Sequence, residues 1–260
     1  MVEVQARHAR WPERLWIVRH GQSAGNVARD AADEAKADRI ALEGRDVDVP
    51  LSGLGEEQAR ALGHWFGQGE EGDRPDIILT SPYLRAVQTS HLFRDCGGAH
   101  EDTSICMDER LREKEFGILD GWTTHGIVNN LPDQAAFRRL LGKFYHRPPG
   151  GESWCDVIFR LRAVMDTISL HYAERRVLIV AHQVVVLCMR YIIENMDEQQ
   201  ILAIDKEGDV ANCAITEYRL DRSIGHEGGL KLVRYNITAP MEKEHAAVTR
   251  APEAIVASRG

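Results

Sequence analysis

Short apolar segments alternate along the chain with amphipathic segments, and this alternation constrains the fold more than any other feature. Residues 15–19, 76–80 and 177–181 each form a run of strand length that is rich in β-branched side chains. Stretches with one apolar face, 54–66 and 157–168, lie between these runs. Runs that are apolar at nearly every position are typical of parallel strands buried on both faces. The pattern predicts an α/β protein, a three-layer α/β/α sandwich with a mostly parallel central sheet.

The length of 260 residues suits one core of this kind, so we expect a single domain over residues 13–236. Near the end of this domain, 211–220 and 230–235 flank a polar turn, which predicts a hairpin that closes the sheet. Residues 237–260 carry charge, alanine and proline without sustained periodicity. We expect them, and residues 1–12, to form mobile tails.

Two local signals predict helices. The segment 30–43 is rich in alanine and charge, which favours a surface helix inserted after the first strand. Ser153 and Asp156 have the spacing of a capping box, with Asp in place of Glu. A helix is therefore expected to begin just after them, following the loop 148–151.

Composition excludes several classes of function. The formal net charge of −8 leaves no broad basic surface for a nucleic-acid backbone, so no nucleic-acid partner is expected. The five cysteines form no C-x-x-C pair, which argues against a disulfide framework or a zinc knuckle and fits a reducing compartment. The first residues lack the apolar stretch of a signal peptide, and no apolar run is long enough to span a bilayer. A cytoplasmic location without a membrane partner is the expectation.

Two histidines and two arginines follow the three predicted strands. Arg19 and His20 end the first strand, and His182 ends the last. Arg85 lies in the first turn or so of a helix that starts after Pro82. A single histidine at a strand end is more often structural than functional. However, the carboxyl ends of parallel strands form the usual ligand crevice of an α/β sheet, so we expect these side chains to converge.

These residue types suit the binding and transfer of a phosphoryl group. Guanidinium groups and helix N-termini bind oxyanions. A neutral imidazole is a competent nucleophile near neutral pH when a backbone carbonyl holds its other nitrogen in the protonated form. No carboxylate-rich cluster accompanies these strand ends, so neither a metal ion nor another cofactor is expected.

The ordered motifs of the chain resemble those of the histidine phosphatase superfamily, which includes cofactor-dependent phosphoglycerate mutases, fructose-2,6-bisphosphatases and broad phosphatases. The likeness spans most of the chain and favours the phosphatase branch and the phosphoglycerate mutase-like fold. The matching motifs are R-H-G-Q-S-A-G-N from Arg19, D-V-P-L-S-G-L-G-E-E-Q-A from Asp48, S-P-Y-L-R-A-V-Q-T from Ser81, L-R-E-K-E-F-G from Leu111, P-G-G-E-S from Pro149 and V-A-H-Q from Val180.

The resemblance implies that His20 accepts the phosphoryl group and that Glu113 is the proton donor. Glu109 and Glu115 compete for the donor role, but the register of the L-R-E-K-E-F-G motif favours Glu113. Gln22 stands where many members have Glu. The resemblance also implies that Arg19, Arg85 and His182 hold the phosphate oxygens, and that Asn26, Ser23 and Gln183 bind the substrate. Gln183 stands where many members have Gly.

The predicted function is a metal-independent phosphomonoester hydrolase that acts through a phosphohistidine on a small phosphorylated metabolite. Residues 120–150 are expected to form a lid-like insertion over the pocket. Two alternatives stay open: a cofactor-dependent phosphoglycerate mutase, and a catalytically weak member that binds phosphorylated ligands. The sequence names neither the physiological substrate nor the oligomeric state, and a homo-oligomer is compatible with it.

Overall fold

A single six-stranded sheet forms the centre of the protein, which we describe from a computed structural model covering residues 9–69 and 71–250. The strand order is β3-β2-β4-β1-β5-β6. The first four strands in this order pair in parallel, and β5 and β6 add to β1 as an antiparallel hairpin. The strands are β1 (Arg14–Arg19), β2 (Ile77–Thr80), β3 (Ser104–Met107), β4 (Arg176–Ala181), β5 (Ile215–Asp221) and β6 (Gly229–Ile237). The predicted α/β class, the mostly parallel sheet and the hairpin are confirmed.

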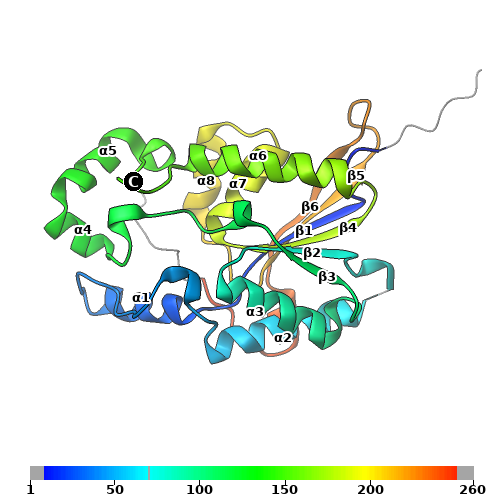
Figure 1. Ribbon diagram of the computed structural model, residues 1–260, viewed down its shortest axis with the longest axis horizontal. Coiled ribbons are helices and arrows are strands. Elements are labelled where there is room, and N and C mark those ends of the chain that lie inside the picture. The colour runs from blue at the N-terminus through cyan, green and yellow to red at the C-terminus, as the bar shows by residue number, and fades with distance from the viewer. Residues whose placement is uncertain (1–8, 70, 251–260) are drawn as a thin grey trace, which may run out of the picture.

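Helices cover both faces of the sheet (Figure 1). On one side lie α6 (Trp154–His171) and α7 (Gln183–Ile193), with α8 (Glu198–Glu207) beside them. On the other side lie α2 (Gly53–Gly67) and α3 (Leu84–Phe93). Alternate side chains of β1 enter the two cores: Leu15 and Ile17 pack with α6 and α7, and Trp16 and Val18 pack with α2 and α3. Burial on both faces explains why the strand is apolar at successive positions.

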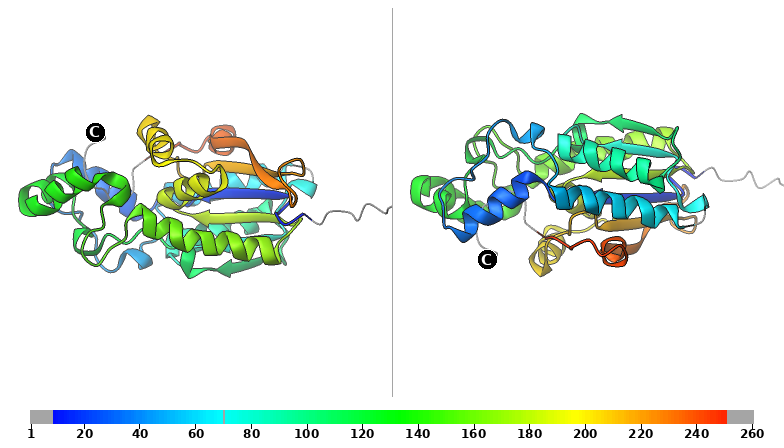
Figure 2. Two further views of the ribbon diagram at one scale, coloured as in Figure 1. Left: turned by 90° about the horizontal axis from the view of Figure 1, so that it is seen from above. Right: turned by 90° about the horizontal axis from the view of Figure 1, so that it is seen from below.

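A second group of helices lies beyond one end of the sheet, in all the views of Figures 1 and 2. It consists of α1 (Ala24–Glu34), α4 (Thr124–Asn130) and α5 (Pro132–Tyr145). The segment after α1 pairs with the start of the segment 120–150: the amide of Ile40 donates to Gly121 O at 2.9 Å. The Arg39 guanidinium also lies over the Trp122 ring, 3.6 Å from its centroid.

The helix predicted over 30–43 is wrong in its bounds. It begins at Ala24, because Ser23 and Asn26 form a capping box, and ends at Glu34, shortly before Lys36 takes a φ of 51°. Helix propensity alone did not locate either end. In contrast, the predicted capping box of Ser153 is confirmed, and α6 begins directly after it.

The prediction of a mobile tail is wrong for residues 237–250, which pack on the domain. Here α9 (Ala239–Lys243) covers α2, and Met241 is completely buried. Gln58 Nε2 donates to Ala247 O at 2.7 Å and to Thr249 Oγ1 at 2.9 Å. A few polar bonds of this kind hold a segment whose sequence has no periodicity.

At the other end of the chain, the Arg10 amide donates to Glu227 O at 3.0 Å, so residues from 9 onward are also packed. Residues 1–8 and 251–260 of the predicted tails lie outside the described residues. Within the described part of the chain, no helix has both the length and the apolarity to cross a membrane.

Candidate active site

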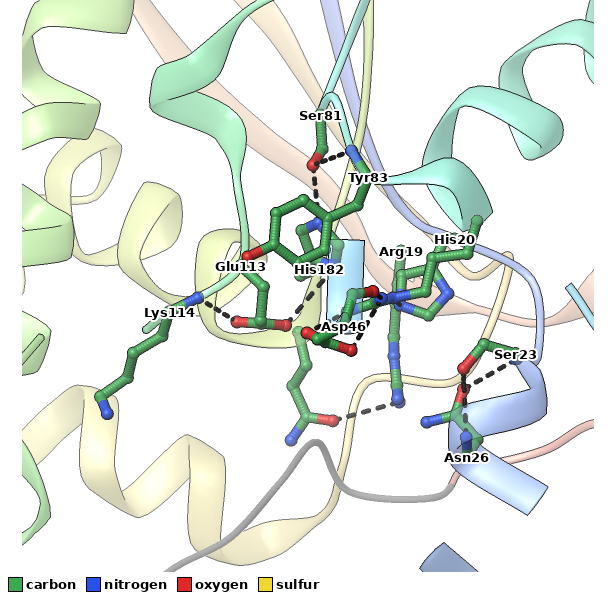
Figure 3. A network of polar contacts seen from close by, with 12 residues as sticks. Arg19, His20, Ser23, Asn26, Asp46, Ser81, Tyr83, Glu113, Lys114 and His182 are labelled. Atoms are coloured by element: carbon green, nitrogen blue, oxygen red, sulfur yellow. Dashed lines mark hydrogen bonds and ion pairs between the residues drawn. The ribbon is translucent and has the colours of Figure 1, made fainter. Parts of the chain in front are cut away.

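The site lies where β1, β2 and β4 end, at the carboxyl edge of the parallel sheet. The main chain of His20 and Ser81 continues the ladder on either side of β4: the His20 amide donates to Ala181 O at 2.9 Å, and the Ser81 amide donates to Val180 O at 3.0 Å. The rings of His20 and His182 therefore approach each other, with centroids 5.1 Å apart. Figure 3 shows Arg19, His20, Glu113 and His182 gathered in this space.

The hydrogen bonds of His20 fix which nitrogen can react. His20 Nδ1 lies 2.6 Å from Gly21 O, and because a carbonyl only accepts, Nδ1 must carry the proton. Arg85 Nε donates to the other nitrogen, Nε2, at 3.2 Å. The Nε2 lone pair is therefore directed at a guanidinium, in a side chain only 1% exposed.

The loop that carries His20 is held by a close approach between two of the recognised motifs. The backbone of Gly21 and Gln22 lies against the first turn of α2, and a Cβ added at Gly55 would sit 1.9 Å from Gln22 O. Only glycine permits this contact. The Gly21 amide also donates to Thr89 Oγ1 at 3.1 Å, which ties the loop to α3.

Arg85 is engaged by a residue that sequence reasoning missed. Asp46 lies on the short 3₁₀ turn η1 (Asp46–Asp48) and accepts a forked pair of bonds from Arg85, Nη1 to Oδ1 at 3.0 Å and Nη2 to Oδ2 at 3.1 Å. Arg85 Nη1 also donates to the Asp46 carbonyl at 2.7 Å. The Asp46 carboxylate thus takes hydrogen bonds of the Arg85 guanidinium that the resemblance assigns to phosphate. No motif in the sequence singled out Asp46.

His182 and Glu113 form the opposite wall of the site. Glu113 Oε2 lies 3.4 Å from His182 Nδ1, and Glu113 Oε1 accepts from the Lys114 amide at 2.6 Å. His182 Nε2 is 2.8 Å from Ser81 Oγ, a contact that the sequence did not indicate. Of the three candidate acids, Glu113 is the one beside a histidine of the site. Glu115 instead accepts from the Tyr83 hydroxyl at 3.4 Å.

Arg19 lies completely buried behind these groups. Its Nη1 donates to Val210 O at 2.6 Å and to Gln183 Oε1 at 3.1 Å. Gln183 Nε2 in turn donates to Asp209 Oδ1 at 2.8 Å. Gln183, expected to bind substrate, is placed where it positions Arg19.

Ser23 and Asn26 cap the helix that leads away from the site. Asn26 Oδ1 accepts from the Ser23 amide at 3.0 Å and from Ser23 Oγ at 3.1 Å. This arrangement assigns Ser23 mainly to the cap and leaves the Asn26 side-chain amide as the donor available to a ligand. Figure 3 shows both residues on the side of the site where α1 starts.

A cavity of about 110 Å³ opens onto the site. It is lined by five of the predicted residues, by the missed residues Arg29, Asp46 and Asp120, and by an apolar group. The predicted residues are His20, Ser23, Asn26, Arg85 and Glu113; the apolar group includes Ile40, Leu42, Val49 and Phe116. Among residues 9–69 and 71–250, no cluster of three or more His, Cys, Asp or Glu side chains suits a metal ion.

Burial shifts the pKa values of two side chains next to the site, Lys114 and Tyr83. Burial lowers the pKa of Lys114 to about 8, and the charge of Arg138 lowers it further, while Glu113 opposes the change. Figure 3 shows the Lys114 side chain leading away from His20. Burial also raises the pKa of the Tyr83 hydroxyl, which therefore stays protonated, with its ring 5.1 Å from that of His182.

Comparison with known proteins agrees with this arrangement. The family model of the histidine phosphatase superfamily (branch 1) matches residues 15–238, most of the chain. The chain belongs to this superfamily. The family and the fold that were inferred from the motifs are thereby confirmed.

Its relatives carry the names of both phosphatases and mutases. It is 32% identical over 180 residues to the 6-phosphofructo-2-kinase/fructose-2,6-bisphosphatase of Caenorhabditis elegans, an alignment that covers 68% of this chain but only 33% of that protein. It is 28% identical over 178 residues to "Probable phosphoglycerate mutase GpmB" of Yersinia enterocolitica, covering 68% and 72% of the two chains. The solved structure named "Mycobacterial hydrolase 1" superposes with a TM-score of 0.66 at 25% identity, covering 86% of this chain and 98% of that one.

Proposed function

We propose that the chain is a metal-independent phosphomonoester hydrolase acting on a small phosphorylated metabolite. The observation that carries the proposal is the bond from His20 Nδ1 to Gly21 O, because it leaves the Nε2 lone pair as a nucleophile inside a pocket lined by arginine. Membership of a superfamily whose relatives are named as phosphatases supports the reaction class.

In the first step, the bound phosphate replaces His20 Nε2 as the acceptor of the Arg85 Nε hydrogen bond, and the released Nε2 lone pair attacks phosphorus while the bond from phosphorus to the ester oxygen breaks. Glu113, in its protonated form, gives its proton to that oxygen, because an alkoxide is a poor leaving group until it is protonated. Positioned acid catalysis of this kind contributes about 10²- to 10⁴-fold. In the second step, Glu113 takes a proton from water, the water oxygen attacks phosphorus, and the N–P bond breaks to release phosphate and regenerate neutral His20.

Three side chains stabilise the transferring group in this scheme: Arg85, Arg19 and His182. Arg85 contacts Nε2 directly and is therefore next to the attacked phosphorus. Arg19 and His182 are completely buried, which strengthens their interaction with a dianion. Neutralisation of the phosphate oxygens by fixed positive groups is the task that magnesium performs in many other phosphoryl-transfer sites.

The first experiment measures hydrolysis of p-nitrophenyl phosphate in EDTA, followed by quenching in alkaline detergent, analysis of the phosphorylated residue, and a test of whether the label is lost in acid. We expect turnover without added metal and an acid-labile label on His20, and no label in the His20→Ala variant. A His64→Ala variant changes a half-exposed histidine outside the site and should behave as wild type. A label on another residue, or an absolute need for magnesium, contradicts the proposal.

The second experiment tests the acid with a series of leaving groups. Glu113→Gln should slow hydrolysis of alkyl phosphates much more than that of p-nitrophenyl phosphate, since p-nitrophenolate leaves readily without a proton. Glu115→Gln is the matched control, because that side chain contacts Tyr83 rather than His182. The comparison is made in kcat/KM, which reports the first step, because hydrolysis of the phosphoenzyme also uses Glu113. Equal losses of kcat/KM for both ester types in Glu113→Gln would refute the assignment of Glu113 as the acid.

A mutase is the second candidate, because several relatives are named as phosphoglycerate mutases. Incubation with 3-phosphoglycerate and a bisphosphoglycerate primer separates the two activities. We expect release of inorganic phosphate without formation of 2-phosphoglycerate.

A further inference from the structure

A second cavity, of about 290 Å³, lies at the opposite end of β1 from His20. Arg14, the first residue of β1, lines it, whereas His20 follows the last residue of that strand. The strand register places Arg14 opposite Arg219 and Trp16 opposite Glu217, so these four side chains lie on one face of the sheet. This is the face that α2 covers, at the end of the sheet away from α1, α4 and α5 (Figure 1). Among the described residues, the linings of this cavity and of the active-site cavity have no member in common.

The second cavity is positively charged in a protein whose formal net charge is −8. The described residues that line it include four basic side chains and two acidic ones. The basic ones are Arg14, Arg219, Arg234 and Lys243, and the acidic ones are Asp73 and Glu217. A local surplus of positive charge in a concave site raises the concentration of anions there. The cavity therefore favours an anionic ligand.

Two of these guanidinium groups share one buried carboxylate. The Glu217 side chain is 3% exposed, and its Oε1 and Oε2 lie 2.9 Å from Arg219 Nε and 2.8 Å from Arg234 Nε. The Arg219 and Arg234 side chains are themselves 46% and 36% exposed. Because each guanidinium uses Nε for Glu217, its terminal Nη groups can donate to an anion of the ligand. Glu217 thus holds both arginines in place, but one carboxylate does not neutralise both.

The pairing of Arg14 with Arg219 adds to the surplus of positive charge. Like charges directly opposite each other on neighbouring strands are destabilising. Arg14 forms an ion pair with Asp73, but that side chain is 41% exposed, so solvent weakens the pair. Lys243 of α9, which donates to Gln68 Oε1 at 2.6 Å, adds an ammonium group from the helices above the sheet. A dianion in the cavity would relieve the repulsion between these basic groups.

Trp65 of α2 provides a flat apolar surface in the same cavity. Its side chain is partly buried, and the Arg234 guanidinium lies 6.0 Å from the centroid of its ring. The corresponding distance between Arg39 and Trp122 is 3.6 Å, so Arg234 covers the Trp65 ring much less closely. A planar ring of a ligand can therefore stack on Trp65.

We propose that this cavity is a second binding site, for a small organic phosphate that carries a planar ring. Arg14, Arg219 and Lys243 bind the phosphate, because two guanidinium groups and an ammonium match the charge and the acceptors of a dianion. Trp65 stacks on the ring. The volume of about 290 Å³, against about 110 Å³ at the active site, leaves room for the organic part of the ligand. The proposal does not rest on the proposed function, because it uses none of the residues assigned to phosphoryl transfer.

Titration of the full chain, followed by NMR, tests the proposal. The indole N–H resonance of Trp65, assigned with the Trp65→Phe variant, reports on this cavity. Three probes that a phosphatase cannot hydrolyse separate the contributions: methylphosphonate carries the anion alone, adenosine the ring alone, and the 5′-methylenephosphonate analogue of AMP both. We expect the analogue to shift the Trp65 resonance to saturation. It should bind about tenfold or more tightly than either other probe, since charged hydrogen bonds and stacking each contribute about that factor.

The Arg219→Gln variant should raise the Kd of the analogue about tenfold. It leaves Arg234 paired with the buried Glu217, and thermal unfolding checks that the fold is kept. Lys243→Gln, at an exposed position on α9, should also raise the Kd and does not touch Glu217. Arg60→Gln removes a positive charge from an exposed position on α2 and should leave the Kd unchanged.

Several results overturn the proposal. One is a Trp65 resonance that does not move with the analogue, including the case in which the analogue only inhibits p-nitrophenyl phosphate hydrolysis competitively and so binds at the active site. Another is binding of adenosine or methylphosphonate as tight as that of the analogue. A third is a Kd that is unchanged in both Arg219→Gln and Lys243→Gln, or that rises equally in Arg60→Gln. Failure of the proposed function appears instead as absent turnover or a label away from His20, and it leaves the Trp65 titration unaffected.

Discussion

Replacing Asp46 by Asn should strengthen the binding of inorganic phosphate. In the structure, Asp46 takes two guanidinium bonds of Arg85 through its carboxylate and a third through its carbonyl. A phosphate on Arg85 must displace the carboxylate, and it must also tolerate its negative charge. Asn keeps the size of the side chain and its oxygen acceptor but removes the charge, so the competitor becomes weaker.

The exposure of the two partners sets the size of the effect. The Arg85 side chain is 6% exposed, but that of Asp46 is 40% exposed, so the pair is intermediate between a surface and a buried ion pair. Exposed pairs contribute about 0.2–1 kcal/mol, and hydrogen bonds to charged groups in buried positions contribute about 1.5–3 kcal/mol. A value of about 1 kcal/mol corresponds to roughly fivefold tighter phosphate binding.

The assay is competitive inhibition of p-nitrophenyl phosphate hydrolysis by phosphate, at fixed pH and ionic strength. Asp48→Asn is the matched control, because Asp48 lies on the same turn but pairs with the exposed Arg45. We expect a lower inhibition constant for Asp46→Asn and an unchanged one for Asp48→Asn. If phosphate inhibits Asp46→Asn no better than wild type, Asp46 does not compete for Arg85. If both variants gain equally, the effect is one of general charge.

Three further predictions concern stability and the His20 loop. Lys114→Met should raise the free energy of unfolding at pH 7 by about 1–3 kcal/mol, because it removes a buried charged ammonium. The gain is full below about pH 8, the pKa of Lys114 in the folded protein, and disappears as the pH rises toward 10.5, its pKa in the unfolded chain. Denaturant unfolding of both proteins at pH 7 and at pH 10.5 checks this sign. Gly55→Ala should lower both kcat/KM and Tm, since its Cβ would meet Gln22 O, whereas Gly53→Ala, with open space around its Cβ, should change neither; equal behaviour would refute the contact. Ser153→Ala removes the cap of α6 and should cost about 1 kcal/mol, or about 2–4 °C in Tm by calorimetry, and an unchanged Tm would count against the cap.

The parallel strands were predictable because burial on both faces leaves a clear pattern. β1 and β4 are continuous apolar runs, and a polar residue that directly follows such a run must lie where the carboxyl ends of the parallel strands meet. The same reasoning predicts from the sequence alone that His20 and His182 lie close together. Strand β3 gave no such signal, since as an edge strand it is mostly exposed.

Other features depend on contacts between segments far apart in the sequence. Asp46 reaches Arg85 because a 3₁₀ turn happens to fold over α3, and no local pattern encodes that distance. The end of the chain is held by single bonds from Gln58 to Ala247 and Thr249, which periodicity cannot reveal. Short-range propensity also placed the helix after β1 wrongly, because the cap at Ser23 decided its start.

The pairing of β1 with β4 has a consequence for how the chain becomes active. Arg14 pairs with Arg176 and Arg19 with Ala181, so the two histidines meet only after the segment from His20 to His182, 163 of the 260 residues, has been folded together. No contiguous fragment shorter than this span contains both rings. During synthesis, catalytic competence should therefore emerge late and abruptly, and enzymatic turnover should serve as a sensitive reporter of completed folding.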